Sequence, residues 1–90
     1  MEKTFTERTS PEVCSESVRI TLENNLVRNV EFRGGCPGNL AALSVLVAGM
    51  PAEEVIRKLR GIRCGVKSTS CADQLAKILS EHLAGTRKNP

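Results

Sequence analysis

Aromatic residues are nearly missing from this sequence, which has no tryptophan, no tyrosine and only two phenylalanines, Phe5 and Phe32. The core must therefore be built from leucine, valine, isoleucine and alanine. Proteins that bind single-stranded nucleic acid without sequence preference stack its bases on aromatic side chains. Because such side chains are scarce and the net charge is only +3, we expect no nucleic acid among the partners.

Long apolar segments are missing too. Charges at Glu2, Lys3 and Glu7 occupy the place where a signal peptide would have its apolar stretch. The longest apolar run, residues 40–50, is shorter than the roughly 20 residues that a transmembrane helix needs. We therefore expect no membrane partner and a cytoplasmic location, where cysteines are more often thiols or metal ligands than disulfides.

The length of the chain indicates a single domain. Ninety residues suffice for one modest hydrophobic core. We place this domain at residues 1–85. Residues 86–90 follow a glycine that ends the last expected helix, and we expect them to form a disordered tail.

The first part of the sequence predicts a small antiparallel sheet. Residues 17–23 alternate between apolar and polar side chains, which is typical of a half-buried strand. Asn24 and Asn25 predict a tight turn, because asparagine tolerates positive φ, and residues 26–33 return as the second strand of a hairpin. Residues 4–6 are a possible N-terminal strand beside it.

Three helices are expected after the hairpin. The first, residues 40–48, is apolar almost all round, so we expect it to be the central helix or to form the contact of a possible homodimer. The second begins at Pro51 and ends at Gly61. The third begins after Ser70, which can cap the helix. Asp73 follows three residues later, so the pair comes close to the capping-box pattern. Strands followed by helices, without a βαβ repeat, predict an α+β fold in which the helices cover a small antiparallel sheet.

The chemistry of the chain depends on its four cysteines, which are Cys14, Cys36, Cys64 and Cys71. They contain no Cys-x-x-Cys pair, so the usual zinc-ribbon and thioredoxin patterns are absent. All four nevertheless fall in expected loops or at expected helix starts, and a helix start favours a thiolate. A shared metal site and four inert buried thiols both remain open from these features.

The neighbours of the cysteines favour the shared site. Glycines beside Cys36 and Cys64 would let backbone or a ligand approach closely. Thr69 and Ser70 are expected to donate hydrogen bonds to a thiolate. The one histidine, His82, lies 11 residues after Cys71 on the same helix, roughly 16 Å away, so the two cannot share a metal ion. We expect His82 at the surface or at the edge of the core.

The segment Thr69–Ala76, which reads Thr-Ser-Cys-Ala-Asp-Gln-Leu-Ala, resembles the motif that names the TSCPD domain family. It has alanine where the motif has proline. The segments Gly34–Asn39 and Gly61–Gly65 resemble two further signatures of that family, and Cys14 matches its early cysteine. The resemblance extends from about residue 5 to residue 83.

Several properties are implied by this resemblance alone. Similar domains occur at the C-terminus of cobalamin-dependent ribonucleotide reductases, which implies an accessory or regulatory partner of that enzyme, binding protein or nucleotide. The resemblance also implies a metal site, holding zinc or an iron–sulfur cluster, with the ligands Cys14, Cys36, Cys64 and Cys71. It does not imply catalysis by this chain, because 90 residues cannot hold the barrel, radical site and substrate pocket of a reductase.

Two weaker interpretations complete the sequence analysis. Residues 30–44 are similar to the strand–glycine–cysteine–helix segment of NifU-type iron–sulfur scaffold proteins. A thiol-redox protein, with Cys64 and Cys71 as a switchable pair, is the other alternative. That pair can close only if its α-carbons come within about 7 Å.

Overall fold

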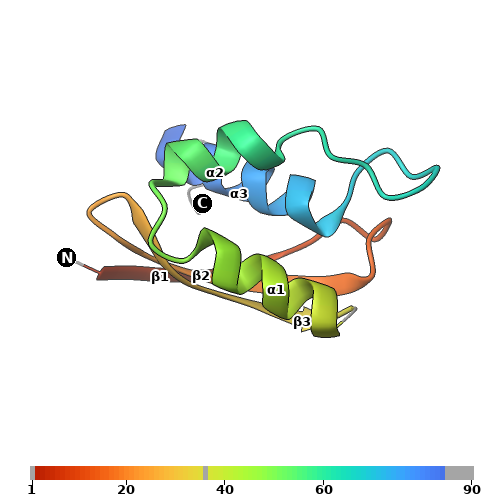
Figure 1. Ribbon diagram of the computed structural model, residues 1–90, viewed down its shortest axis with the longest axis horizontal. Helices are drawn as coiled ribbons and strands as arrows, with labels where there is room; N and C mark the ends of the chain where they lie inside the picture. The colour runs from red at the N-terminus through yellow and green to blue at the C-terminus, as the bar shows by residue number, and fades with distance from the viewer. Residues whose placement is uncertain (1, 36, 85–90) are drawn as a thin grey trace.

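An antiparallel sheet forms the first half of the fold and helices form the second (Figure 1). The computed structural model describes residues 2–35 and 37–84. Within these residues the strands are β1 (Glu2–Arg8), β2 (Ser15–Glu23) and β3 (Leu26–Gly34), and the helices are α1 (Pro37–Val47), α2 (Ala52–Leu59) and α3 (Cys71–Ala84). The predicted α+β class, with helices packed on a small antiparallel sheet, is confirmed. The expected tail, residues 86–90, lies outside the described residues, so the predicted domain limits stay a prediction.

The predicted hairpin joins β2 and β3. Asn24 and Asn25 both have positive φ, 53° and 65°, which is the requirement of a tight hairpin turn that matches the twist of the strands. The possible N-terminal strand is also present and is longer than predicted. It pairs with β2 along its whole length, from Glu2 opposite Glu23 to Arg8 opposite Ser17. As an edge strand with mostly exposed side chains, β1 shows too little alternation for its full length to be read from sequence.

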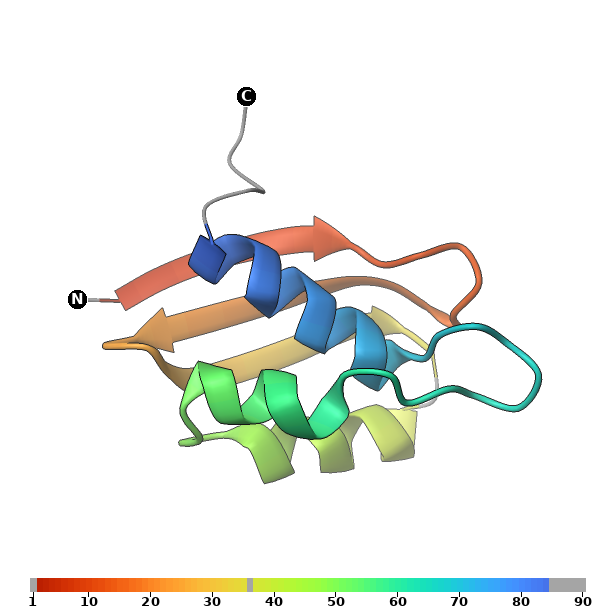
Figure 2. The ribbon, with the colours of Figure 1, turned by 90° about the horizontal axis from the view of Figure 1, so that it is seen from above.

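Helix α3 lies across the inner face of the sheet and is the central helix (Figure 2). Its side chains Leu75, Ile78 and Leu79 are buried in one cluster with Val18 and Ile20 of β2. Burial of each such side chain contributes about 1.5–3 kcal/mol. Helix α2 packs beside α3 and adds the fully buried Val55.

The expectation that the first helix is central was wrong. Helix α1 packs along β3 at the edge of the sheet (Figure 2), and its buried residues are Leu40 and Val47. Val45 and Leu46 are 74% and 73% exposed. Helix α3 already lies across the inner face of the narrow sheet (Figure 2), and an all-round apolar pattern does not say which neighbour a helix takes. The dimer contact, the other expectation for this helix, stays a prediction.

Backbone hydrogen bonds attach the end of α1 to the start of β3. The Gly49 N–H donates to the Val27 carbonyl at 2.6 Å, and the Val27 N–H donates to the Met50 carbonyl at 2.8 Å. Gly49 has a φ of +87°, which glycine adopts without strain. These bonds hold α1 against the sheet edge. In the described part of the chain, no helix combines the length and the apolar character that crossing a membrane requires.

Candidate functional site

The three described cysteines line one pocket at an end of the molecule. The pocket has a volume of about 360 Å³, and Cys14, Cys64 and Cys71 all contribute to its walls. Cys14 directly precedes β2, Cys64 lies in the loop between α2 and α3, and Cys71 is the first residue of α3. Both loops project from the same end of the fold (Figures 1 and 2). The fourth predicted ligand, Cys36, lies outside the described residues.

The rest of the pocket lining includes both apolar and basic residues. Leu40 and Leu43 of α1 and Val13 are among the apolar ones. Arg63 and Lys67, from the same loop as Cys64, are the basic ones. The two cations give this part of the pocket lining a positive charge.

Two of the described cysteines, Cys14 and Cys71, are in contact. Their Sγ atoms lie 4.0 Å apart. A disulfide needs a separation of about 2.05 Å, so the two are not joined. In a tetrahedral zinc site with Zn–S bonds of about 2.3 Å, two sulfur ligands lie about 3.8 Å apart. The separation of this pair therefore fits two ligands of one metal ion.

Cys64 belongs to a turn at the mouth of the pocket. Its carbonyl accepts a hydrogen bond from the Lys67 N–H at 3.0 Å, and its own N–H donates to the Thr69 carbonyl at 3.2 Å. Its side chain is exposed. Across residues 2–35 and 37–84, no three histidine, cysteine, aspartate or glutamate side chains form a group ready to hold a metal ion. The structure thus brings Cys14 and Cys71 together and leaves Cys64 on the rim.

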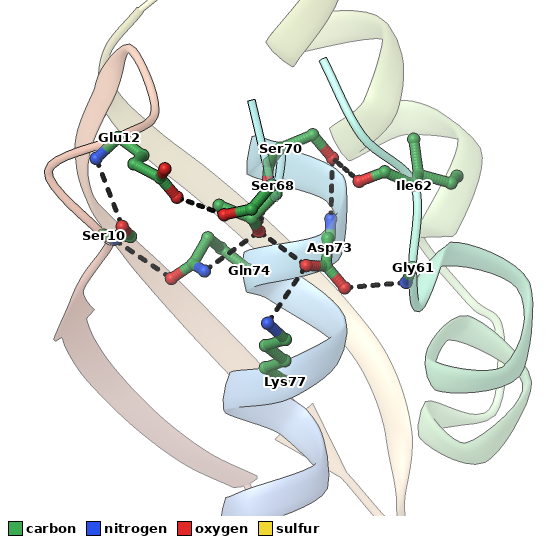
Figure 3. A network of polar contacts seen from close by, with 10 residues as sticks. Ser10, Glu12, Gly61, Ile62, Ser68, Ser70, Asp73, Gln74 and Lys77 are labelled. Atoms are coloured by element: carbon green, nitrogen blue, oxygen red, sulfur yellow. Dashed lines mark hydrogen bonds and ion pairs between the residues drawn. The ribbon is translucent and has the colours of Figure 1, made fainter. Parts of the chain in front are cut away.

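The residues around Cys71 explain why the loop and the helix start keep their places. Ser70 caps α3 as predicted, because its Oγ accepts the Asp73 N–H at 3.1 Å. The Ser70 hydroxyl in turn donates to the Ile62 carbonyl at 2.7 Å, which ties the loop of Cys64 to the helix of Cys71 (Figure 3).

Asp73 is buried at the centre of this network and is 2% exposed. Its carboxylate accepts hydrogen bonds from the Gly61 N–H at 2.7 Å and the Thr69 hydroxyl at 2.5 Å, and Lys77 Nζ lies 3.3 Å away (Figure 3). Burial by itself raises the pKa of Asp73, but the hydrogen bonds from Thr69 and Gly61 and the charge of Lys77 together outweigh it. The pKa of this carboxyl therefore lies below its ordinary value.

Two sequence predictions about this segment were wrong. Asp73 does not complete a capping box, because its carboxylate binds Gly61 and Thr69 from the preceding loop. Thr69 and Ser70 do not donate to a thiolate, since their hydroxyl hydrogens are directed to Asp73 and to the Ile62 carbonyl. A hydroxyl does contact Cys71, but it is that of Ser15, whose Oγ lies 3.1 Å from the Cys71 Sγ. Ser15 lies 56 residues from Cys71, and no local pattern indicates this contact.

Further hydrogen bonds connect the loop before Cys14 to the same network (Figure 3). The Ser10 N–H donates to Gln74 Oε1 at 3.0 Å, and Gln74 Nε2 donates to Thr69 Oγ1 at 3.1 Å. The Ser68 hydroxyl donates to the Glu12 carboxylate at 2.5 Å. The segments that carry Cys14, Cys64 and Cys71 are therefore held to one another by side-chain hydrogen bonds as well as by the core.

Gly35 lies against Cys14 and leaves no room for a side chain. A Cβ placed on Gly35 would lie 2.7 Å from Leu40 Cδ1 and 3.3 Å from Cys14 Sγ. Its φ of +86° also favours glycine. The close approach expected at the glycines beside Cys36 and Cys64 is thus found at Gly35, where it brings the end of β3 next to the sulfur pocket. It is not found at Gly65, where a Cβ would meet no atom within 4 Å.

His82 occupies the edge of the core, as predicted, at the opposite end of α3 from Cys71. Its ring stacks on Phe5 with centroids 3.6 Å apart, and its Nε2 lies 3.1 Å from Glu7 Oε2. It takes no part in lining the sulfur pocket. The contact fastens α3 to the edge strand β1.

Comparison with known proteins gives one match. A family model described as the TSCPD domain matches residues 1–83 of the 90. The searches of curated proteins and of solved structures found no match.

Proposed function

This chain belongs to the TSCPD domain family, and we propose that it is a small metal-binding module whose cysteine thiolates hold zinc or an iron–sulfur cluster. The family is linked to ribonucleotide reductase. The observation that carries the proposal is the 4.0 Å separation of the Cys14 and Cys71 sulfur atoms in a pocket that Cys64 also lines. A site made only of thiolates leaves no open coordination position, so its role is structural.

The proposed ligands are Cys14, Cys36, Cys64 and Cys71. Cys14 and Cys71 supply two ligands whose backbones are already fixed, because Cys14 directly precedes β2 and Cys71 begins α3. Cys64 joins them through a rearrangement of the turn at residues 63–67, since Ile62 and Thr69 on either side of it are held by Ser70 and Asp73. Cys36 is assigned from the sequence alone, and its neighbour Gly35 lies within contact of Cys14.

The pair favours a single metal ion over a four-iron cluster. Two sulfur ligands of one tetrahedral ion lie about 3.8 Å apart, close to the separation of Cys14 and Cys71. In a four-iron cluster each cysteine binds a different iron, so the sulfur atoms lie farther apart. The separation therefore fits zinc or a two-iron cluster, in which two cysteines bind each iron, better than it fits a four-iron cluster.

The charge of the pocket suits such a centre. One Zn²⁺ with four thiolates has a formal charge of about −2, from two positive and four negative charges. Arg63 and Lys67 line the pocket and offset part of it. We expect Cys64 and the two cations to move together, because they share one loop.

The test is the metal content of protein purified without oxygen or chelators. Elemental analysis by mass spectrometry and a visible spectrum then distinguish zinc from an iron–sulfur cluster. We expect about one zinc per chain, and its loss in Cys71→Ser. The matched control is Ala72→Ser, which adds a hydroxyl to the same helix start and keeps every thiol. Protein that contains neither metal, with all four thiols titratable, would refute the proposal.

A second proposed role, as an accessory partner of ribonucleotide reductase, follows from the family link. It requires association with a reductase catalytic subunit, through protein contacts or a shared nucleotide. Co-purification of tagged protein with that subunit, repeated with and without nucleoside triphosphates, tests it. An empty capture under both conditions would contradict this role and leave the metal proposal untouched.

A further inference from the structure

One edge of the sheet is open. The strand order is β1-β2-β3, so β1 and β3 are the edges. The edge at β3 is occupied by the end of α1, through the hydrogen bonds of Val27 with Gly49 and Met50. Within residues 2–35 and 37–84, β1 pairs with β2 alone, and Figure 2 shows it on the side of the sheet opposite α1. An open edge strand is the place where another strand can extend a sheet.

The free edge of β1 carries the backbone groups of every second residue. The Thr9 N–H donates to the Glu16 carbonyl at 3.1 Å, and these two residues continue the register in which β1 pairs with β2. Hydrogen-bonded and non-hydrogen-bonded pairs alternate along antiparallel strands, so the odd-numbered residues of β1 bond to β2. The N–H and C=O groups that point away from β2 are those of Glu2, Thr4, Thr6 and Arg8.

The sequence of β1 is complementary to its own reverse. From Glu2 to Arg8 it reads Glu-Lys-Thr-Phe-Thr-Glu-Arg. Consider two copies of this strand that run antiparallel with Phe5 of one opposite Phe5 of the other. The other opposed pairs are then Glu2 with Arg8, Lys3 with Glu7, and Thr4 with Thr6. Every charged side chain of the strand therefore lies opposite a side chain of the other sign.

The free backbone groups fit the same register. The even-numbered opposed pairs are the ones whose backbone groups point away from β2, so each of them exchanges two hydrogen bonds with the second copy. Phe5 lies opposite its own copy in a non-hydrogen-bonded pair, with Cβ atoms about 4.5–5.5 Å apart. A shift of two residues in either direction keeps hydrogen bonding possible but sets charged side chains opposite threonine or phenylalanine. The charges therefore select one register.

We propose that β1 is the interface of a homodimer, in which the β1 strands of two copies pair antiparallel about a two-fold axis at Phe5. The two sheets then continue as one, and the same patch is used twice. Charged side chains on an edge strand ordinarily oppose pairing with other chains. Here their order favours a second copy over strands of other sequence. We place the contact at β1 and not at the first helix, because uncharged α1 specifies neither a partner nor a register.

The side chains of β1 are placed to make these contacts. Glu2 and Arg8 are exposed, and neither makes an ion pair with another described residue. On the same face, Thr4 Oγ1 lies 3.0 Å from Thr21 Oγ1, and Thr6 of the second copy would extend this row of hydroxyls. On the inner face, Lys3 of the second copy would join Glu7, whose Oε2 already lies 3.1 Å from His82 Nε2.

The size of the contact sets its expected strength. Strand β1 has seven residues and is therefore about 24 Å long. A contact through one strand is smaller than a standard interface, which buries about 800 Å² on each partner. We therefore expect weak association, with a dissociation constant on the order of 10–100 μM.

The test is the mass in solution, measured by sedimentation velocity and light scattering from about 1 to 500 μM. We expect the mass to rise toward twice the 9.8 kDa of one chain. Glu2→Arg and Arg8→Glu each place like charges opposite one another at both ends of the contact, and each should raise the dissociation constant about 10-fold or more. The matched control is Glu53→Arg, an equal change of charge on exposed α2, which should leave the dimer intact.

An equimolar mixture of the two β1 variants provides the rescue. The outer face of β1 then has cations at both ends in one variant and anions at both ends in the other, so we expect a heterodimer where neither variant associates alone. Circular dichroism confirms that each variant is folded. Metal content should stay unchanged in both, because no residue of β1 lines the sulfur pocket, so failure of the dimer leaves the metal proposal standing.

Each result decides the proposal. Loss of the dimer in the single variants with recovery in the mixture supports it. Amide hydrogen exchange that slows at Thr4 and Thr6 as the wild-type concentration rises supports it without any substitution. A wild-type mass of 9.8 kDa throughout the range would overturn it. Association that the single variants leave unchanged, or that the mixture does not restore, would overturn it as well.

Discussion

The Sγ atoms of Cys14 and Cys71 lie 4.0 Å apart, although 57 positions separate the two residues in the chain. Cys14 precedes the central strand of the sheet, and Cys71 begins the helix that crosses that strand. Burial of Leu75, Ile78 and Leu79 fixes this crossing, because these residues place α3 on the inner face of the sheet. The approach of the two sulfur atoms is therefore a consequence of core packing, supported by the hydrogen bonds around Asp73.

The first prediction concerns mild oxidation of metal-free protein. Diamide removes two electrons and two protons from a pair of thiols, and we expect the new disulfide to join Cys14 to Cys71. Their sulfur atoms need to move only about 2 Å to reach bonding distance. Peptide mapping under non-reducing conditions identifies the linkage. Zinc loading should protect both thiols, and a Cys64–Cys71 linkage as the main product would contradict the prediction.

The second prediction concerns the buried carboxylate. Asp73→Asn leaves the Gly61 and Thr69 donors with a weaker acceptor and leaves Lys77 without its charge partner. We expect a loss of about 1–3 kcal/mol in the free energy of unfolding, measured by urea denaturation at pH 7. Glu53→Gln, in the exposed first turn of α2, is the control and should change stability by less than about 0.5 kcal/mol. Equal effects from the two substitutions would show that the network around Asp73 does not hold the loop.

The third prediction concerns pH. The pKa of Asp73 is lowered in the folded protein, so the folded state binds fewer protons than the unfolded state near that pKa. Its contribution to stability is complete above the unfolded pKa of about 3.9 and is lost as the pH falls through the folded-state value. We expect the metal-free wild type to lose stability below about pH 5 more steeply than Asp73→Asn, whose amide does not titrate. Urea unfolding at several pH values measures both slopes, and parallel slopes would contradict the assignment.

The fourth prediction compares two glycines near the sulfur pocket. Gly35→Ala should lower the free energy of unfolding by about 1–3 kcal/mol, because its Cβ would clash with Leu40 in a backbone conformation that disfavours alanine. Gly38→Ala should be neutral or stabilising by up to about 1 kcal/mol, since its Cβ meets no atom within 4 Å and the position is helical. If Gly38→Ala is the more damaging change, the packing of β3 against Cys14 is described incorrectly.

Local signals in the sequence were enough to predict most of the fold. The asparagines at 24 and 25 predict the hairpin turn, and Ser70 predicts the start of the helix that proves to be central. The position of α1 was missed, because its apolar residues occur on every side and the sequence does not state which side meets the sheet. The full length of β1 was missed because an exposed edge strand has little pattern.

The candidate site was predicted in part. Cys14, Cys64 and Cys71 were selected because of their places in loops and at helix starts, and the structure brings them to one pocket. The partners of Asp73 and the contact of Ser15 with Cys71 were not predictable, because they join segments 12 and 56 positions apart. Such contacts depend on how helices and loops pack on the sheet, which no local pattern encodes.

The most direct measurement of the central claim is X-ray absorption at the zinc edge of protein loaded with one equivalent of zinc. The account predicts a first shell of sulfur alone, with Zn–S distances of about 2.3 Å and about four sulfur atoms. Cys71→Ser should lose one sulfur from that shell. A first shell of nitrogen and oxygen, or zinc that gel filtration removes completely, would contradict the claim that these cysteines form a metal site.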